Sequence, residues 1–209
     1  VTGVIALMLE ANPELTWRDI KYILANTAKV GDIENMAENR AGYKFDEKNN
    51  YGFGIIDAEA AVKMANTYKK ELGDLEVKKT LEVTSTNVID EKEPTSKIEF
   101  TIHEDINIEA ITLSYKVKFY PRSDSAFKNL RMTVTPPTGL FKLITIPSYP
   151  SSHEANGPKI TLNHFYGESA KGNWRFDFKH SQDPEYIENI TMTMTIYGTK
   201  EDISKTANP

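Results

Sequence analysis

The residue types that perform acyl transfer are present in this chain, and histidine is the scarcest of them, with four copies. A nucleophilic serine needs a histidine as general base and a carboxylate to orient that base. Ser169, His164 and Asp177 could be drawn as such a set, but His164 and Asp177 fall on different predicted strands. Nothing in the spacing forces them together, so we interpret His164, beside Phe165 and Tyr166, as a buried or half-buried strand residue.

Two acidic segments, 103–109 and 180–189, carry oxygen ligands of the kind that calcium prefers. Both lack the spaced ligands and the glycine of an EF-hand loop. We interpret both segments as solvated loops. Their candidate ligands are His103, Glu104 and Asp105 in the first segment, and His180, Asp183, Glu185 and Glu188 in the second.

Arg122, Lys128 and Arg131 lie near aromatic residues in the segment 120–131 and could contact an acidic partner. We interpret them instead as surface residues of a strand. The net charge of -5 gives no support to nucleic-acid binding.

The composition excludes several other classes of function. The chain has no cysteine, which excludes disulfides, thiolate nucleophiles and cysteine-ligated zinc. No apolar run is long enough to cross a bilayer, so we expect no membrane span. There is no signal-peptide pattern, and because the sequence opens abruptly on Val1 we expect a fragment of a longer protein. The 39% of hydrophobic residues is enough for a substantial core.

The first part of the chain has helical periodicity. An apolar helix is predicted from Val1 to about Glu10, ended by Asn12-Pro13. Its apolar residues nearly surround the helix axis, and such a helix belongs inside a larger protein. We therefore predict self-association through residues 1–30, or disorder of that stretch in a monomer.

Two further helices are marked by their ends. Thr16 and Asp19 form a variant of the capping box, and Gly31 is the expected end of that second helix. The third helix is predicted to follow Asp57, which can cap it, and to end at Gly73.

After Gly73 the period becomes two, which is typical of strands with one buried face. Pro-Gly turn signals separate these runs, and we predict about eight strands between Glu76 and Thr199, followed by a polar tail. Strands without intervening helices indicate an antiparallel β-sandwich. The inward residues are expected to be Leu113, Tyr115, Val117, Phe119, Leu130, Met132, Val134, Trp174, Phe176, Phe178, Met192, Met194 and Ile196.

Several separated phrases resemble one protein family. The opening "VTGVIALMLEANPELTWRDIKYILANTA" resembles the segment that follows the nucleophilic serine in kexin/furin-type subtilisin-like serine proteases, the proprotein convertases. "YGFGIIDAEAAV" is similar to the phrase that closes their catalytic domain. "NLRMTVTPPTGL", "FYGESAKGNWRFDF" and "ITMTMTIYGT" resemble motifs of the P domain, also called Homo B, which follows it. The resemblance runs from Val1 to about Thr199.

The resemblance implies that the active site lies upstream of Val1. In subtilisins the triad runs Asp, His, Ser along the chain, and the matched segment begins after the serine. This chain contains no Gly-Thr-Ser motif. We therefore predict no catalytic, cofactor-binding or metal-ligating residue here. The family's catalytic domain has calcium sites, and these too would belong to the parent protease.

The phrase "YGFGIIDA", residues 51–58, is interpreted as a structural closure. Its glycines allow close backbone packing or positive φ, its aromatic residues fill space, and Asp57 caps the helix that follows.

These inferences combine into one prediction. The fold is mainly β: a jelly-roll-like antiparallel β-sandwich preceded by a three-helix remnant of a subtilisin-like α/β domain. Residues 1–73 would end the peptidase domain, 75–199 would be the P domain, and 200–209 the tail. The resemblance implies that the P domain docks on the catalytic domain and stabilises it.

The same resemblance sets the expected partners. They are the rest of the chain's own catalytic domain and the parent's peptide or protein substrates, in a secreted, periplasmic or extracellular location. The alternative is a freestanding β-sandwich module that binds carbohydrate or acts as an adhesin. That alternative requires Trp174 to face solvent, whereas its alternation with Phe176 and Phe178 predicts that it points inward.

Overall fold

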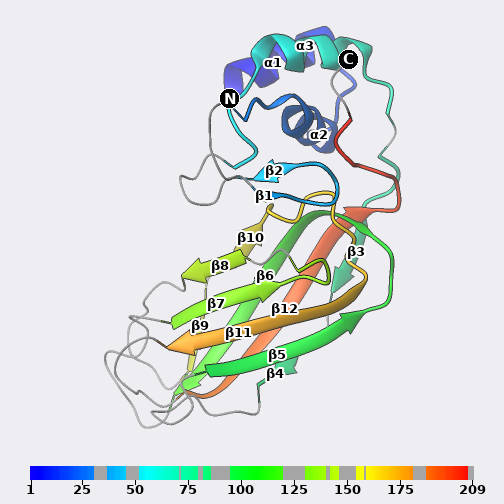
Figure 1. Cartoon of the computed structure of the whole chain (residues 1–209). Coiled ribbons are helices and arrows are strands. Elements are labelled where there is room, and N and C mark those ends of the chain that lie inside the picture. Colours follow the sequence, from blue (N-terminus) through cyan, green and yellow to red (C-terminus); the bar gives the residue numbers. More distant parts are fainter. Residues whose placement is uncertain are drawn as a thin grey trace.

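The computed structural model describes residues 1–30, 37–45, 52–70, 72–79, 82–85, 95–119, 130–139, 142–145, 154–157, 159–180 and 187–206. Three helices form one end of the molecule and two facing β-sheets form the other, as Figure 1 shows. A short hairpin of β1 (Ala37–Glu38) and β2 (Lys44–Phe45) lies between them. The predicted fold class, an antiparallel β-sandwich preceded by three helices, is confirmed.

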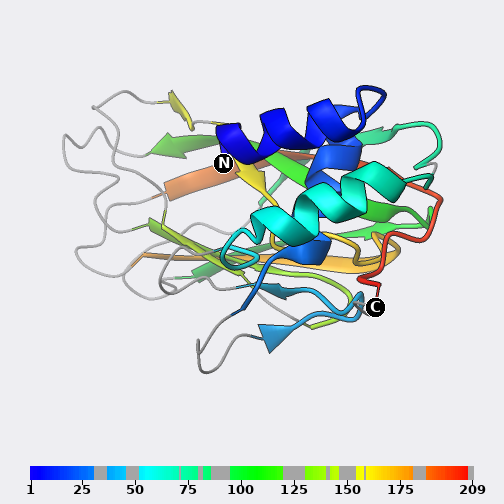
Figure 2. The same cartoon turned by 90° about the horizontal axis from the view of Figure 1, so that it is seen from above.

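The helices are α1 (Thr2–Ala11), α2 (Trp17–Thr27) and α3 (Ala58–Thr67). α3 packs against both α1 and α2, and seen from above it lies beside α1 (Figure 2). The predicted capping box of α2 is present, with the Thr16 side chain accepting from the Asp19 amide and the Asp19 carboxylate accepting from the Thr16 amide. None of the described helices has the length and apolar character that crossing a bilayer requires.

Two helices end earlier than their sequences predict. α2 stops at Thr27 rather than near Gly31, which lies outside the described residues. α3 stops at Thr67 rather than Gly73, because Tyr68 adopts an extended conformation and its hydroxyl donates to Asp19 at 2.9 Å. Tertiary contacts here override local helix propensity.

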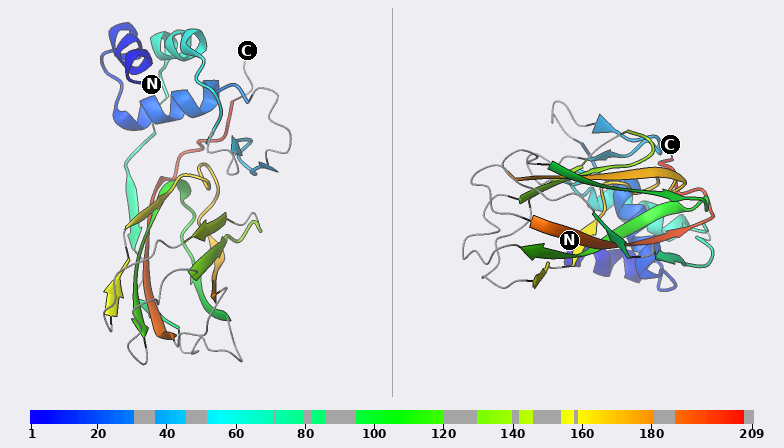
Figure 3. Two further views of the ribbon diagram at one scale, coloured as in Figure 1. Left: turned by 90° about the vertical axis from the view of Figure 1, so that its left-hand side faces the viewer. Right: turned by 90° about the horizontal axis from the view of Figure 1, so that it is seen from below.

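The sandwich consists of a six-stranded and a four-stranded antiparallel sheet, seen edge-on in Figure 3. The first is built on the order β10-β6-β12-β3, with β4 added to β12 and β9 added to β6, and the second has the order β5-β11-β7-β8. The long central pair is β6 (Asn107–Phe119) with β12 (Ile187–Thr199). The other strands are β3 (Glu76–Lys79), β4 (Val83–Thr84), β5 (Thr95–Ile102), β7 (Leu130–Thr135), β8 (Lys142–Thr145), β9 (Glu154–Asn156), β10 (Ile160–Leu162) and β11 (Gly172–His180).

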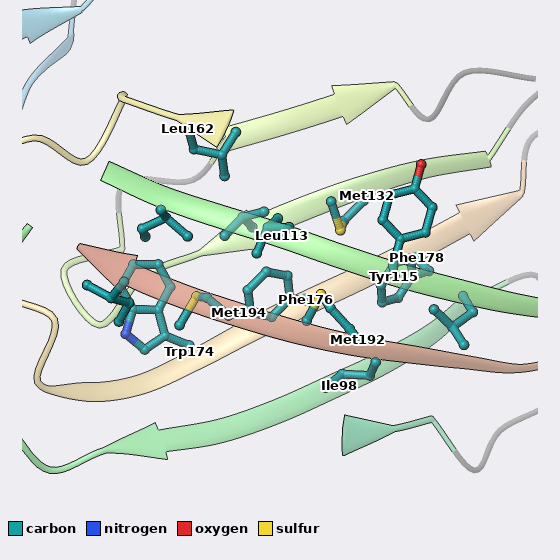
Figure 4. Packing of buried hydrophobic residues seen from close by; sticks show 14 of the residues in the cluster. Ile98, Leu113, Tyr115, Met132, Leu162, Trp174, Phe176, Phe178, Met192 and Met194 are labelled. Carbon is teal, nitrogen blue, oxygen red and sulfur yellow. The ribbon is translucent and has the colours of Figure 1, made fainter. Parts of the chain in front are cut away.

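The alternation of apolar residues predicted the sandwich core correctly. Trp174, Phe176 and Phe178 of β11 point between the sheets together with Met192 and Met194 of β12, as Figure 4 shows. The inward residues predicted on β6 and β7 are also buried, except that the side chain of Phe119 lies outside those described. A buried face on each of two stacked sheets accounts for this single core.

Two details of the strand prediction are wrong. Between Glu76 and Thr199 the described residues form ten strands, β3 to β12, rather than about eight, because β4, β9 and β10 are too short to show an alternating pattern. His164 is buried as expected, but it lies in the turn after β10 rather than on a strand.

Candidate docking interface

Arg18, in the first turn of α2, joins the helical part to the sandwich. Its Nε lies 3.0 Å from both carboxylate oxygens of Glu109 on β6. Its Nη1 donates to the carbonyl of Gly73 at 2.7 Å, and its Nη2 donates to that of Leu72 at 3.1 Å. The hydrogen bond to Glu109 raises the pKa of Arg18 against the opposing effect of its own burial. A guanidinium suits this site because its fixed fork serves a carboxylate and two carbonyls at once.

Lys21 stands one helical turn from Arg18, on the same face of α2. Its Nζ donates to the backbone carbonyl of Glu109 and, at 2.8 Å, to Oδ1 of Asn163. The same ammonium lies 5.0 Å from the ring centroid of Tyr166. Burial lowers the pKa of Lys21 to about 8. Arg18 and Lys21 therefore bind both the side chain and the main chain of Glu109.

A second set of contacts joins the loop before β2 to the turn after β10. Asn39 donates through Nδ2 to the carbonyl of Tyr166 at 2.8 Å, and the amide of Arg40 donates to Oε1 of Glu168 at 2.8 Å. Gly167 has a positive φ of +79°, and a Cβ there would lie 2.6 Å from Cβ of Ala41. The close approach of the two loops requires glycine at this position.

Residues 52–57, the described part of the phrase "YGFGIIDA" that precedes α3, are called the closing loop. Aromatic rings continue the contact from this loop into the sandwich core. The ring of Phe53 packs edge-on against Phe45 at 5.0 Å between centroids, and Phe45 packs against His164 at 5.1 Å. His164 contacts Phe165, whose ring lies 5.5 Å from that of Trp174. Edge-to-face pairs at these separations are favourable. This series of rings connects the phrase "YGFGIIDA" to Trp174.

The backbone of the closing loop is held against the end of α2. Ile55 and Lys29 exchange two backbone hydrogen bonds of 2.8 Å. Gly54 has φ of +120°, and a Cβ there would lie 2.5 Å from the carbonyl oxygen of Lys29. Asp57 caps α3 through the amide of Ala60 at 3.0 Å and pairs with the Lys29 ammonium at 2.6 Å. The predicted capping role of Asp57 is confirmed. The contacts of the closing loop therefore hold the structure together at the ends of α2 and α3. Tyr51 lies outside the described residues.

An apolar groove of about 550 Å³ lies between α1, α2 and this closing loop. Trp17 at its edge is 62% exposed, and on α1 the side chain of Leu7 is 50% exposed. α1 buries Met8 against the rest of the helical part and leaves apolar residues on its other sides. The groove is lined by Ile5, Trp17, Ile20, Lys21, Leu24, Ala25, Ala28, Phe53, Gly54 and Ile56.

The residues considered as a triad have separate surroundings. The Ser169 hydroxyl donates to Asp105 at 2.7 Å, and Asp177 accepts from Nε of Arg175 at 2.8 Å. His164 is held among the rings of Phe45 and Phe165.

The residues considered as metal ligands also have other contacts. Glu104 pairs with Lys78, and Glu188 pairs with Lys118 at 2.8 Å. Among the described residues there is no group of three or more His, Asp or Glu side chains that could hold a metal ion. Two of the candidate ligands, Asp183 and Glu185, lie outside the described residues. The same holds for Arg122 and Lys128 of the basic segment, whereas Arg131 is exposed on β7.

Sequence reasoning identified none of the four interface residues Arg18, Lys21, Glu109 and Asn163. Glu109 is 1% exposed, although it is a carboxylate, and the run around it, "INIEAITL", is otherwise largely apolar. A charge in such a run was the available signal, because a buried carboxylate needs a cationic partner.

Comparison with known proteins supports the resemblance drawn from the motifs. No known family model matches the chain. It is 27% identical to endoprotease bli-4 of Caenorhabditis elegans over 96% of its length, and 28% identical to furin of Rattus norvegicus, also over 96%. Over 32% of the chain it is 44% identical to human proprotein convertase subtilisin/kexin type 5.

The chain corresponds to a limited part of these relatives. It spans 21% of bli-4 and 25% of furin. A serine protease of Aeromonas sobria, solved in complex with a chaperone, has the same fold, with a TM-score of 0.74 at 18% identity over 96% of this chain and 43% of that one. The chain is thus related in sequence to a segment of the furin- and kexin-type proprotein convertases, as its motifs predicted.

Proposed function

We propose that the chain is the C-terminal part of a subtilisin/kexin-type serine endopeptidase, and that its sandwich is a non-catalytic P domain that docks on the peptidase domain and stabilises it. The observation that carries the proposal is the binding of Glu109 by both Arg18 and Lys21. Arg18 belongs to the phrase that resembles the peptidase domain, and Glu109 belongs to the sandwich.

The proposed division of the chain places residues 1–73 in the peptidase domain, 75–199 in the P domain and 200–209 after it. It is supported by the large apolar cluster of the sandwich, whose buried members run from Ile98 to Ile196. A chain of residues 75–199 should therefore unfold in one cooperative transition, which a denaturant titration followed by Trp174 fluorescence can measure. Non-cooperative unfolding would mean that both parts share one core.

The apolar groove and α1 are proposed to pack against the preceding part of the same peptidase domain. The groove is almost wholly apolar, as the inner face of a domain core is. The relatives extend far beyond the matched segment, so they contain residues that could cover this surface. Peptide or protein substrates, and calcium, would then bind the parent protease rather than residues of this chain. We place the parent in a secreted, periplasmic or extracellular setting by the same similarity.

The alternative, a freestanding carbohydrate-binding or adhesin-like module, depends on an exposed aromatic platform. Trp174 is fully buried, and its Nε1 donates to the carbonyl of Ala170 at 2.8 Å. This observation favours the protease proposal.

The sequence encoded upstream of Val1 is the direct test. A Gly-Thr-Ser-x-Ala-x-Pro motif immediately before Val1, with Asp and His motifs earlier, is the expected result. An unrelated upstream sequence would overturn the proposal. The 209-residue chain alone should not hydrolyse fluorogenic peptides that carry a dibasic site. Turnover that is abolished by mutating one of its own serines would contradict the assignment.

A further inference from the structure

The residues that follow the sandwich return to the helical part. After β12 ends at Thr199, the chain runs back along the helices, and this red segment is visible in Figures 1 and 3. Ile203 is fully buried there, in the apolar cluster that also contains Tyr22, Ile23 and Tyr43. The sequence predicts a polar tail here. In the structure, however, Ile203 lies in the apolar core of the helical part.

The backbone of the segment is bound by buried groups of the helical part. The Tyr43 hydroxyl donates to the carbonyl of Ile203 at 2.6 Å, and the amide of Lys205 donates to the carbonyl of Ala41 at 2.7 Å. The amide of Thr206 donates to Oδ1 of Asn26 at 2.8 Å. Three main-chain groups in four residues are therefore recognised, which fixes the register of the segment.

Asn26 and Tyr43 form a connected recognition pair. Asn26 is 1% exposed, and its Nδ2 donates to the Tyr43 hydroxyl at 3.0 Å, so that this hydroxyl both accepts and donates. Burial raises the pKa of Tyr43, which keeps the phenol protonated and able to donate. Without the segment, Oδ1 of Asn26 and the Tyr43 hydroxyl would each lose a partner in a largely buried position, which is unfavourable.

The start of the segment is anchored at the junction of the two parts. The Thr199 hydroxyl donates to the carbonyl of Leu72, and the Lys70 ammonium donates to that of Asp202. Asn107 donates through Nδ2 to the carbonyl of Glu201 at 2.8 Å. The segment is thus held from the end of β12 to Thr206.

We propose that residues 199–206 form a strap that closes the core of the helical part, and that Asn26 and Tyr43 form a recognition site for this extended segment with one aliphatic side chain. The helical part then reaches its packed state only after residues beyond the sandwich have bound to this site. Packing of the helical part, which comes first in the sequence, thereby depends on residues 199–206, which follow the sandwich.

Hydrogen exchange on the 209-residue chain tests the strap. Ile203→Asp places a charge in the core, whereas Ser204→Asp places the same charge on the adjacent, half-buried position and serves as the control. We expect the amides of α2 to exchange about tenfold faster or more in Ile203→Asp. The amides of β11 should keep their protection in both variants.

A shortened chain ending at Lys200 provides a second test in case Ile203→Asp fails to fold. Its α2 amides should be unprotected, and a synthetic peptide of residues 199–209 should restore their protection. The same peptide with Asp in place of Ile203 should not. Unchanged α2 protection in both altered chains would overturn the proposal. Loss of protection in β11 together with α2 would also overturn it. The segment would then stabilise the helical part and the sandwich as one folding unit, rather than the helical part alone. None of these outcomes depends on whether the parent is a protease.

Discussion

Arg18 of α2 and Glu109 of β6, 91 positions apart in the sequence, form a partly buried ion pair in which the Nε of Arg18 lies 3.0 Å from both carboxylate oxygens. The side chains are 12% and 1% exposed. The pair connects the helical part directly to the sandwich. Its energetic role can be separated from that of surface pairs because the chain contains a matched exposed pair, Lys118 with Glu188.

Glu109→Gln should destabilise the chain by about 1–3 kcal/mol, because it leaves the partly buried Arg18 guanidinium without its counter-charge. Glu188→Gln, at a pair whose side chains are 42% and 41% exposed, should cost about 0–1 kcal/mol. Urea unfolding at neutral pH measures both changes. Equal losses in the two variants would show that the partly buried pair contributes no more than a surface contact.

Trp174→Ala should lower the free energy of unfolding by about 3–5 kcal/mol, because it removes a large aromatic side chain from the middle of the sandwich core. Trp17→Ala is the control, since Trp17 is 62% exposed at the groove and little packing is lost. Thermal unfolding by circular dichroism compares the two. A melting temperature that Trp174→Ala leaves unchanged would indicate a surface platform and would favour the carbohydrate-binding alternative.

Stability should fall as the pH drops from about 6.5 towards 4. Burial, and secondarily the charge of Lys142, lowers the pKa of His164 from an ordinary value of 6.5 to about 4. Between these values the unfolded chain binds the proton and the folded chain does not, so stability is present above pH 6.5 and is lost as the pH falls through this window. The loss attributable to His164 is expected to be about 2–3 kcal/mol.

His164→Phe should flatten this pH dependence, because it retains a ring between Phe45 and Phe165 and removes the titrating group. His103→Gln, at an exposed position, is the control for the removal of a histidine. Urea midpoints at pH 4.5 and pH 7 give the comparison. An unaltered slope in His164→Phe would assign the acid sensitivity to other groups.

The 209-residue chain on its own should self-associate through residues 1–30, because α1 and the groove expose apolar surface that burial would stabilise at about 25 cal/mol per Å². Leu7→Glu, at a side chain 50% exposed, should reduce the association measured by light scattering. Val77→Glu, at a side chain 55% exposed on β3, should not. A monomeric chain with strongly protected amides from Val4 to Leu9 would show that the prediction is wrong.

Local sequence patterns were sufficient for the elements whose causes are local. The capping box of Thr16 and Asp19 lies within four residues, and the alternation of Trp174, Phe176 and Phe178 lies within five, so each was visible before the fold was known. The motifs around them also predicted the relationship to the proprotein convertases. Such patterns can be recognised in the sequence because the residues that form them are close together along the chain.

Only the tertiary structure decided the features that depend on distant partners. Glu109 became an interface residue because Arg18 and Lys21 lie against it, and α3 ended at Thr67 because Tyr68 reaches Asp19. The strap at Ile203 depends on Tyr43, 160 positions away. No local propensity encodes these pairings, because their free energy comes from desolvated contacts that exist only after the sheets and helices have met.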